Sequence, residues 1–327
     1  MITIHTEISE INAAQWAELV ENSAVVSFFQ TRECYAFYCS LSFLEPFVFA
    51  VSENEKLVGL ICGYIIADGG AIKRFFSRRA IVPGGALLDE NISDHALQSL
   101  LNTTAKILKN KVIYTELRNY NDYSKYKNTF RKAKFDYQTH LNFHLKIEKN
   151  VEQKFSESKI RQIHTAQRNG VTYCNTTDKY EIEAFYSILE KLYNRLRLPL
   201  FPLEFFLKLA ELPHGKIFVV KHADTVTGGM ACVTLCKKVI YEWFVCGSKI
   251  SDKQQYTSVM ATYAGIDFAA KNGYELFDFM GAGRPEKDYG VREFKSKFGG
   301  NLVEFGRFLL ICNKFLYKIG KFYIEKL

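Results

Sequence analysis

The stretch Lys216–Cys246, KIFVVKHADTVTGGMACVTLCKKVIYEWFVC, decides the fold that this sequence predicts. It contains three runs rich in β-branched and aromatic residues, at 216–221, 225–236 and 239–246, and short polar turns separate them. Such runs between turn residues are typical of successive strands. The stretch therefore predicts a three-stranded meander.

The elements around this meander occur in the same order in both halves of the chain. In the second half the pattern predicts helices at about 179–196, 202–211 and 257–271, further strands at 276–280 and 302–311, and a final helix. In the first half it predicts helices at about 9–22, 31–43, 93–109 and 123–133, and strands at 47–51, 57–67, 74–82, 112–117 and 135–147. This repetition predicts an α/β fold made of two related domains with mixed sheets.

The length of 327 residues suits two domains of ordinary size. We place the first domain at 1–150 and the second at 151–327. The second includes a connecting helix at 158–170 and a C-terminal helix at 308–327. With 48% hydrophobic and 24% charged residues, the composition excludes a disordered or low-complexity chain.

The net charge of +8 is unevenly distributed. Residues 1–150 carry 17 basic and 16 acidic side chains, whereas residues 151–327 carry 26 and 19. The excess in the second half indicates an anionic partner there, which is a nucleic acid, a phosphorylated substrate or an anionic membrane surface. A solvated surface that keeps the protein soluble is the alternative.

The cysteines and the N-terminus indicate a compartment. The eight cysteines are scattered and none forms a Cys-x-x-Cys pair, so we expect reduced thiols and no structural zinc. His140 and His144 lie four apart without a partner at metal-ligand spacing, so we expect no metal site. There is no signal peptide and no apolar run long enough to span a bilayer, which predicts a cytoplasmic protein.

The segment 278–300, DFMGAGRPEKDYGVREFKSKFGG, is the densest group of chemical side chains. A predicted buried strand contains Asp278 and is followed directly by a glycine turn. Glycines there allow the backbone to come close to other groups. Arg292, Lys295 and Lys297 follow within a framework of aromatic residues. We expect this framework to hold the cations at a functional site, and a flexible loop with solvated charges is the alternative.

Three further segments carry basic residues at particular positions. In the helix at 158–170, Arg161, His164 and Arg168 are spaced i, i+3 and i+7 and form one stripe that suits phosphates, or simply a solvated face. Arg78 lies beside a predicted strand, where it meets a phosphate or lines the rim. The helix at 308–327 interleaves lysines with apolar residues, which favours docking onto the protein over contact with an anionic membrane.

Several of these segments resemble the Fem family of peptidoglycan-bridge aminoacyltransferases. Asp278-Phe-Met-Gly-Ala-Gly283, followed by Tyr289-Gly-Val-Arg-Glu-Phe-Lys-Ser-Lys-Phe-Gly-Gly300, is similar to the signature of that family. Lys159-Ile-Arg-Gln-Ile-His-Thr-Ala-Gln-Arg-Asn-Gly-Val171 is similar to its inter-domain helix, and Phe29–Glu33 and Tyr241–Ser248 match as well. The resemblance spans nearly the whole chain.

This resemblance implies two tandem domains of the GNAT acyltransferase fold. It implies transfer of an aminoacyl group from aminoacyl-tRNA to an amine of a phosphorylated cell-envelope precursor such as a muropeptide, with no other cofactor. It places Lys295 where the family has a lysine that stabilises the developing oxyanion. For removal of the proton from the amine, Asp278, Glu242 and the substrate itself remain alternatives. The residues that we expect at the substrates are Arg292, Phe294, Tyr241, Gly281, Arg161, Arg168, Lys159 and Arg78.

Two other functions remain open. GNAT enzymes that use acyl-CoA usually carry a glycine-rich turn that cradles the pyrophosphate, but Ser248–Ser258 contains no glycine. This favours aminoacyl-tRNA over acetyl-CoA as donor, with N-acylation of an amino sugar or polysaccharide precursor as the alternative. A basic binding module without turnover is the second alternative. Peripheral contact with the inner face of the membrane is expected from the basic C-terminus, and the oligomeric state is left open.

Overall fold

The computed structural model describes residues 1–70, 74, 76–248 and 253–325. Its chain divides into two compact units. Unit 1 comprises Met1–His140 and Glu304–Leu327, and unit 2 comprises Leu141–Val303. Each unit is built on one mixed sheet covered by helices, which confirms the predicted α/β class.

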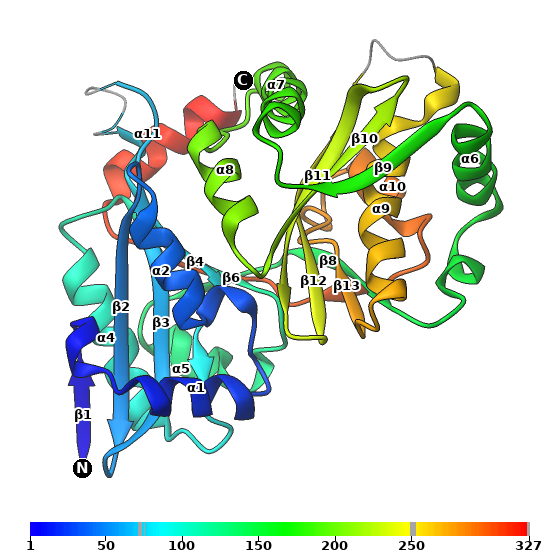
Figure 1. The fold of residues 1–327 in the computed structure, drawn as a ribbon. Coiled ribbons are helices and arrows are strands. Elements are labelled where there is room, and N and C mark those ends of the chain that lie inside the picture. Colours follow the sequence, from blue (N-terminus) through cyan, green and yellow to red (C-terminus); the bar gives the residue numbers. More distant parts are fainter. Residues whose placement is uncertain (71–73, 75, 249–252, 326–327) are drawn as a thin grey trace. The chain divides into compact units, whose positions relative to one another are not determined.

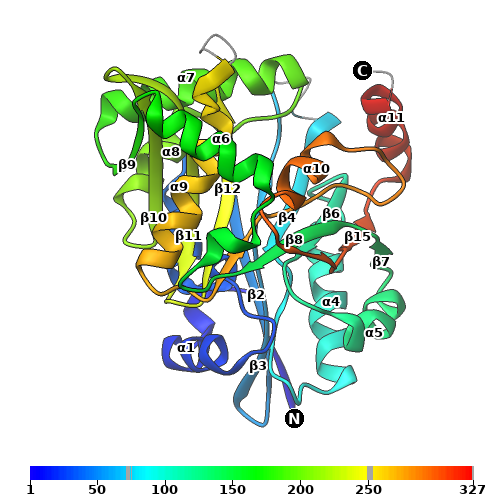
Figure 2. The same ribbon diagram turned by 90° about the vertical axis from the view of Figure 1, so that its right-hand side faces the viewer.

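Unit 1 has the strand order β1-β2-β3-β4-β6-β15-β7, and β5 pairs with β3. Its strands are β1 (Ile2–His5), β2 (Glu45–Glu53), β3 (Lys56–Ile66), β4 (Arg79–Gly84), β5 (Leu87–Leu88), β6 (Tyr114–Asn119), β7 (Asp136–Gln138) and β15 (Arg307–Ile311). Its α-helices are α1 (Ala13–Asn22), α2 (Arg32–Ser40), α4 (Asp94–Leu108), α5 (Lys127–Lys132) and α11 (Lys314–Glu325). Figure 2 shows α1 on one side of β2 and β3, with α4 and α5 on the other.

Unit 2 has the strand order β14-β8-β13-β12-β11-β10-β9. Its strands are β8 (Leu141–Lys146), β9 (Val171–Thr176), β10 (Gly215–His222), β11 (Thr225–Leu235), β12 (Val239–Gly247), β13 (Leu276–Asp278) and β14 (Asn301–Glu304). Its α-helices are α6 (Glu157–Arg168), α7 (Lys179–Leu196), α8 (Leu203–Glu211), α9 (Thr257–Lys271) and α10 (Gly290–Ser296). Figure 1 shows α6 and α9 on one face of this sheet and α7 and α8 on the other.

The three-stranded meander predicted at 216–246 forms as expected. β10, β11 and β12 pair antiparallel in succession. Ala223 and Asp224 join the first two strands with positive φ angles of 45° and 62°, the backbone that a tight hairpin turn requires. The expected first-half hairpin forms between β2 and β3.

The boundary between the units differs from the predicted one at 150/151. The single strand predicted at 135–147 is two strands, of which β7 joins unit 1 and β8 joins unit 2. The strand predicted at 302–311 divides in the same way into β14 and β15. Each half of the chain therefore ends by contributing a strand to the sheet of the other half, which hydrophobic periodicity does not reveal.

The C-terminal helix predicted at 308–327 in the second domain is wrong in its start and its assignment. Residues 307–311 form β15 between β6 and β7, so this segment belongs to unit 1. Phe308 is fully buried and stacks on Phe130 with 3.9 Å between the ring centroids. The helix, α11, begins only at Lys314. Burial of alternate residues, which is the period of a strand, overrode the helical spacing in this segment.

The connecting helix also begins earlier than predicted. It is α6 and starts at Glu157, because the Ser156 hydroxyl accepts from the Lys159 amide and acts as the N-cap. Its predicted end holds, since Gly170 follows it with a φ of +75°.

Cysteines, metal ligands and membrane-spanning helices can be assessed within the described residues. All eight cysteines are free thiols. Within the described ranges, no three His, Cys, Asp or Glu side chains come together as metal ligands. None of the helices seen in those ranges has the length and apolar character needed to cross a membrane.

Replacing Phe308 should selectively weaken unit 1. Phe308→Ala removes a fully buried ring and should lower the free energy of unfolding by about 3–5 kcal/mol. Urea unfolding of the variant in a Trp243→Phe background measures this, because Trp16 in α1 is then the single tryptophan reporter. Phe315→Ala, which changes a ring that is 73% exposed on α11, is the matched control. A loss as small as that of the control would contradict the placement of β15.

Candidate functional site

Two neighbouring strands of unit 2 separate after a short parallel contact. β12 and β13 pair only from Val239 opposite Leu276 to Tyr241 opposite Asp278. Immediately beyond, the pairing of β11 with β12 shifts by one residue, so that Trp243 is an extra residue between Glu242 and Phe244. Such bulges re-aim side chains and are common beside active sites.

Lys295 of α10 lies where these strands part. Its ammonium donates to the carbonyl oxygens of Phe279 (2.5 Å) and Gly281 (3.0 Å) and lies 3.3 Å from Glu242 Oε1. The residue is only 7% exposed. An ammonium has three hydrogens to donate; two of them are donated to these carbonyls, and Glu242 is an ion-pair partner. Lys295 therefore joins the backbone beyond β13 to a carboxylate of β12.

Glu242 completes this arrangement from the other strand. It is fully enclosed, and its second carboxylate oxygen accepts from the Thr262 hydroxyl of α9 at 3.0 Å. Burial raises the pKa of Glu242, and the positive charge of Lys295 opposes that rise. The Lys295–Glu242 contact is within ion-pair distance without the alignment of a hydrogen bond. The predicted catalytic residues Lys295 and Glu242 are thus brought into contact.

The third predicted catalytic residue, Asp278, is held more tightly still. It is 1% exposed. Its Oδ1 accepts from Asn142 Nδ2 (2.7 Å) and from the Met280 amide (2.6 Å), and its Oδ2 lies 3.1 Å from His144 Nε2. Pairing of β8 with β13 places His144 directly opposite Asp278. The sequence contained both residues, but only the strand register brings them together.

The glycine turn after β13 is shaped by the residues predicted to bind substrate. Gly281 has a φ of +129°; its amide donates to Asn142 Oδ1 at 2.6 Å and its carbonyl accepts from Lys295. Arg292 donates to the carbonyls of Ala282 (2.9 Å) and Arg284. Arg292 thus clamps this turn, and its guanidinium is committed to backbone carbonyls where we had expected a phosphate.

Lys159 of α6 contacts Phe294 of α10. The Lys159 side chain is 4% exposed, and its ammonium sits 3.8 Å from the centre of the Phe294 ring and 5.0 Å from that of Phe298. Such contacts are favourable cation–π interactions. Burial, with a smaller contribution from the charge of Lys297, lowers the pKa of Lys159 to about 8. Lys159 therefore supports the helix that carries Lys295.

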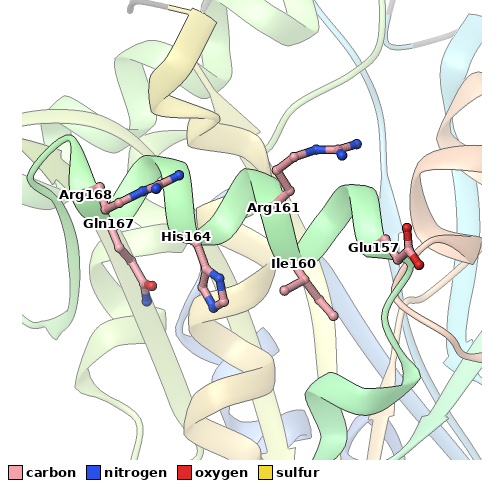
Figure 3. Close-up of a pocket in the computed structure, with 6 residues that line it drawn as sticks. All are labelled: Glu157, Ile160, Arg161, His164, Gln167 and Arg168. Atoms are coloured by element: carbon pink, nitrogen blue, oxygen red, sulfur yellow. The ribbon is translucent and has the colours of Figure 1, made fainter.

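The cationic stripe predicted on the connecting helix lines a surface hollow. Figure 3 shows six side chains of α6 around it. They are Glu157, Ile160, Arg161, His164, Gln167 and Arg168, and the hollow has a volume of about 730 Å³. Ile160 is the apolar member of this lining. Arg161, His164 and Arg168 are exposed there, with a single carboxylate among the lining residues, which suits an anionic ligand.

The last two predicted residues, Tyr241 and Arg78, belong to different units. Tyr241 is 2% exposed and sits on β12 opposite Asp278. Arg78 belongs to unit 1, where it forms an ion pair with Glu45 at 2.5 Å. Within unit 2 the structure thus gathers Lys295, Glu242, Asp278 and Gly281 in one network.

The N-terminus of α9 is where a pyrophosphate would lie in a CoA-dependent relative. Gln255 and Thr257 at this end are only 8% and 4% exposed. A Cβ on Gly247 would lie 2.4 Å from the amide nitrogen of Ser258, so β12 packs directly on the first turn. Part of the loop considered in the sequence, residues 249–252, lies outside the described ranges. The described part of this helix end is covered by the protein's own atoms.

The lowered pKa of Lys159 predicts a dependence of stability on pH. The unfolded lysine has its ordinary pKa of 10.5, so between pH 8 and 10.5 the unfolded state binds more protons and the contribution of Lys159 to stability rises with pH. Lys159→Met removes this rise. The free energy of unfolding of the variant, relative to wild type, should fall by roughly 1–3 kcal/mol from pH 7.5 to 10.5 in urea titrations. Lys191→Met, at an exposed site on α7, is the control, and a pH-independent difference for both variants would contradict the burial of Lys159.

Comparison with known proteins shows which solved structures have a similar fold. No family model matches the chain, and no curated protein sequence matches it. Among solved structures it is similar to FemX, with a TM-score of 0.69 and 14% identity over 94% of this chain and 98% of FemX. It is also similar to a tandem GNAT protein from the clavulanic acid biosynthesis pathway, with a TM-score of 0.61 and 9% identity over 95% of this chain and 99% of that one.

A third similar structure is the C-terminal domain of a putative lysylphosphatidylglycerol synthetase from Agrobacterium fabrum. The TM-score is 0.57, with 12% identity over 91% of this chain and 90% of that domain. All three similarities extend over nearly the whole of both chains. The chain therefore has the Fem-like double GNAT fold, as the resemblance in its sequence implied.

Proposed function

We propose that this protein is an acyltransferase that moves an aminoacyl group from aminoacyl-tRNA to an amine of a phosphorylated cell-envelope precursor such as a muropeptide. The observation that carries the proposal is the buried ammonium of Lys295 at the point where β12 and β13 separate. The tandem GNAT fold, shared with FemX, supports acyl transfer as the reaction class.

A cation at the position of Lys295 suits the chemistry of acyl transfer. When an amine attacks an ester carbonyl, negative charge develops on the carbonyl oxygen, and a preorganised cation in a water-poor site stabilises it. Lys295 is preorganised, because two backbone carbonyls fix its ammonium. Its third contact, with Glu242, is an ion pair without hydrogen-bond alignment, so the developing oxyanion can replace it. Glu242 then orients the lysine before substrate arrives.

The donor is proposed from two features of unit 2. Arg161 and Arg168 offer exposed guanidinium groups to phosphates at the α6 hollow. The covered N-terminus of α9 argues against a CoA pyrophosphate at the described part of that helix end. Both features favour a donor with a phosphodiester backbone that binds along α6, and aminoacyl-tRNA is such a donor. No further cofactor is proposed.

The acceptor is proposed to be a precursor attached to a nucleotide or a lipid. Similarity to FemX supports a muropeptide, and similarity to a putative lysylphosphatidylglycerol synthetase domain supports a lipid-borne acceptor. The eight free thiols support action in the reducing cytoplasm, and the exposed lysines 314 and 318 of α11 support contact with the inner face of the membrane.

The reaction is tested by offering two donors separately. Purified protein is mixed with tRNA charged with radiolabelled amino acids, or with labelled acetyl-CoA, and with muropeptide or phosphatidylglycerol acceptors. Label passing from tRNA to an acceptor supports the proposal. Transfer from acetyl-CoA alone would replace it with a CoA-dependent N-acyltransferase, and binding without transfer would indicate a non-catalytic module.

The role of Lys295 predicts a large kinetic effect. Lys295→Ala should lower kcat by about 10²–10³-fold, as loss of one oxyanion stabiliser does. Lys297→Ala, which removes an exposed lysine two residues further along, should leave kcat unchanged and serves as the control. Because the first change leaves the Glu242 carboxylate buried without its cation, the double variant Lys295→Met, Glu242→Gln separates loss of catalysis from loss of folding. Equal activity of the two single variants would rule out the role of Lys295.

The α6 hollow predicts a salt-dependent effect on donor binding. Replacing Arg161 and Arg168 together by alanine should raise KM for aminoacyl-tRNA and reduce the slope of log KM against log salt by about 1–2. The value of kcat at saturating donor should stay the same. Lys191→Ala removes an exposed cation from α7 and should change neither quantity. If the double variant has the salt slope of wild type, the phosphates bind elsewhere.

A further inference from the structure

The antiparallel pairing of β8 with β13 changes one residue beyond the end of β13, where Phe143 lies opposite Phe279. In a regular ladder the two residues of a hydrogen-bonded pair exchange both N–H···O bonds. The Phe279 amide does donate to the Phe143 carbonyl at 3.1 Å, but the Phe143 amide donates to Asn142 Oδ1 at 2.8 Å. The Phe279 carbonyl accepts from Lys295 at 2.5 Å. One ladder acceptor is thereby given to the ammonium of Lys295.

The next two residues, Met280 and Gly281, are looped out of the ladder. The chain pairs with β8 again at Leu141, whose carbonyl accepts from the Ala282 amide at 2.7 Å and whose amide donates to the Gly283 carbonyl at 2.9 Å. The two looped-out residues have positive φ angles of 54° and 129°, which for a residue other than glycine is uncommon. Buried backbone amides need acceptors, and side chains supply them for this pair.

Asn142 is the side chain that completes the interrupted ladder. It is 6% exposed. Its Oδ1 accepts from the amides of Phe143 (2.8 Å) and Gly281 (2.6 Å), and its Nδ2 donates to Asp278 Oδ1 (2.7 Å). The amide oxygen has two lone pairs, and both are used. The two backbone donors on one side and the carboxylate on the other also fix which atom of the amide is oxygen.

Both backbone carbonyls that hold Lys295 depend on Asn142. Because Asn142 accepts from the Phe143 amide, the Phe279 carbonyl is left for the lysine. Because it also accepts from the Gly281 amide, it fixes the residue whose carbonyl is the second acceptor of Lys295, at 3.0 Å. Without Asn142, the Phe143 amide would compete with Lys295 for the Phe279 carbonyl.

We propose that Asn142 is a positioning residue of the acyl transfer, because it leaves both backbone carbonyls to Lys295. The inference rests on the proposed function, in which Lys295 stabilises the developing oxyanion. Asn142 acts through the lysine: it determines where the ammonium lies before the carbonyl oxygen acquires charge. Its contribution therefore belongs to the transition state and not to binding of the donor.

The first test is a split between kcat and KM. Asn142→Ala should lower kcat by about 10–100-fold, since displacement of a reacting group costs that much rate. The KM for aminoacyl-tRNA should stay within about twofold of wild type, because the lost interaction serves only the transition state. Asn175→Ala, at an exposed asparagine of β9, is the matched control and should change neither quantity. A kcat of Asn142→Ala within twofold of wild type would overturn the inference.

A double-variant cycle shows whether Asn142 acts through Lys295. In the Lys295→Ala background, Asn142→Ala should change the residual kcat by less than about threefold, because no ammonium remains to be positioned. Single-turnover rates with radiolabelled aminoacyl-tRNA measure this. A further loss as large as the one in wild type would show that the two residues act independently, and would overturn the inference.

Asn142→Asp keeps the test usable if the alanine variant does not fold. An aspartate still accepts from both amides, but when ionised it lies beside the Asp278 carboxylate. When protonated it donates to Asp278 as the asparagine does. The ratio of its kcat to that of wild type should therefore rise at least about threefold from pH 8 to pH 6. His144 faces Asp278 in both proteins, and Asn175→Ala should show a constant ratio. A constant ratio for Asn142→Asp would contradict the positioning role.

Failure of this inference is distinguishable from failure of the proposed function. If the wild-type protein transfers from no donor, the proposed function is wrong and the role of Asn142 is wrong with it. If the wild-type protein transfers and Lys295→Ala lowers kcat, but Asn142→Ala retains the wild-type kcat, only the inference about Asn142 is wrong. A loss of kcat in Asn142→Ala that a lowered melting temperature accompanies is judged by the aspartate variant.

Discussion

The Lys295 ammonium lies where two neighbouring strands of unit 2 stop pairing, and several elements contact it there. β12 and β13 run parallel for three residues, and beyond them the backbone carbonyls of Phe279 and Gly281 point at Lys295 in place of β12. A buried ammonium needs hydrogen-bond acceptors and an opposite charge nearby, and a buried carboxylate needs a cation. The positions of the turn, of α10 and of Glu242 therefore depend on one another. Removing any one of them leaves an uncompensated polar group in the interior.

Much of the fold follows from the sequence because its signals are local. Three β-rich runs with turns between them predict the meander, and it forms within one or two residues of the expected ends. The long strands predicted at the end of each half were wrong, since each divides between two sheets. Nothing local distinguishes a strand that continues from one that changes sheet, because the choice depends on partners far away in sequence.

The candidate site shows the same limit of prediction from local sequence. Glycine spacing and basic residues identify the segment around Lys295, and the structure brings Lys295, Glu242 and Asp278 into one network. His144 was dismissed because it lacked a partner nearby in sequence, yet strand register places it opposite Asp278. Arg292 and Lys159 were expected at the substrates from the family resemblance, but the structure commits one to backbone carbonyls and the other to aromatic rings. Residue type indicates which chemistry is available, whereas only packing decides what each cation faces.

The return of β15 to unit 1 affects the order in which the protein is made. Ribosomes synthesise residues 1–140 first, but the place between β6 and β7 stays empty until Arg307–Ile311 emerges, after the whole of unit 2. Unit 2 is continuous in sequence and is free to close its sheet while the nascent chain is still growing. During that interval the edges of β6 and β7 are open to strands of other chains. The domain translated first is therefore the last to be completed.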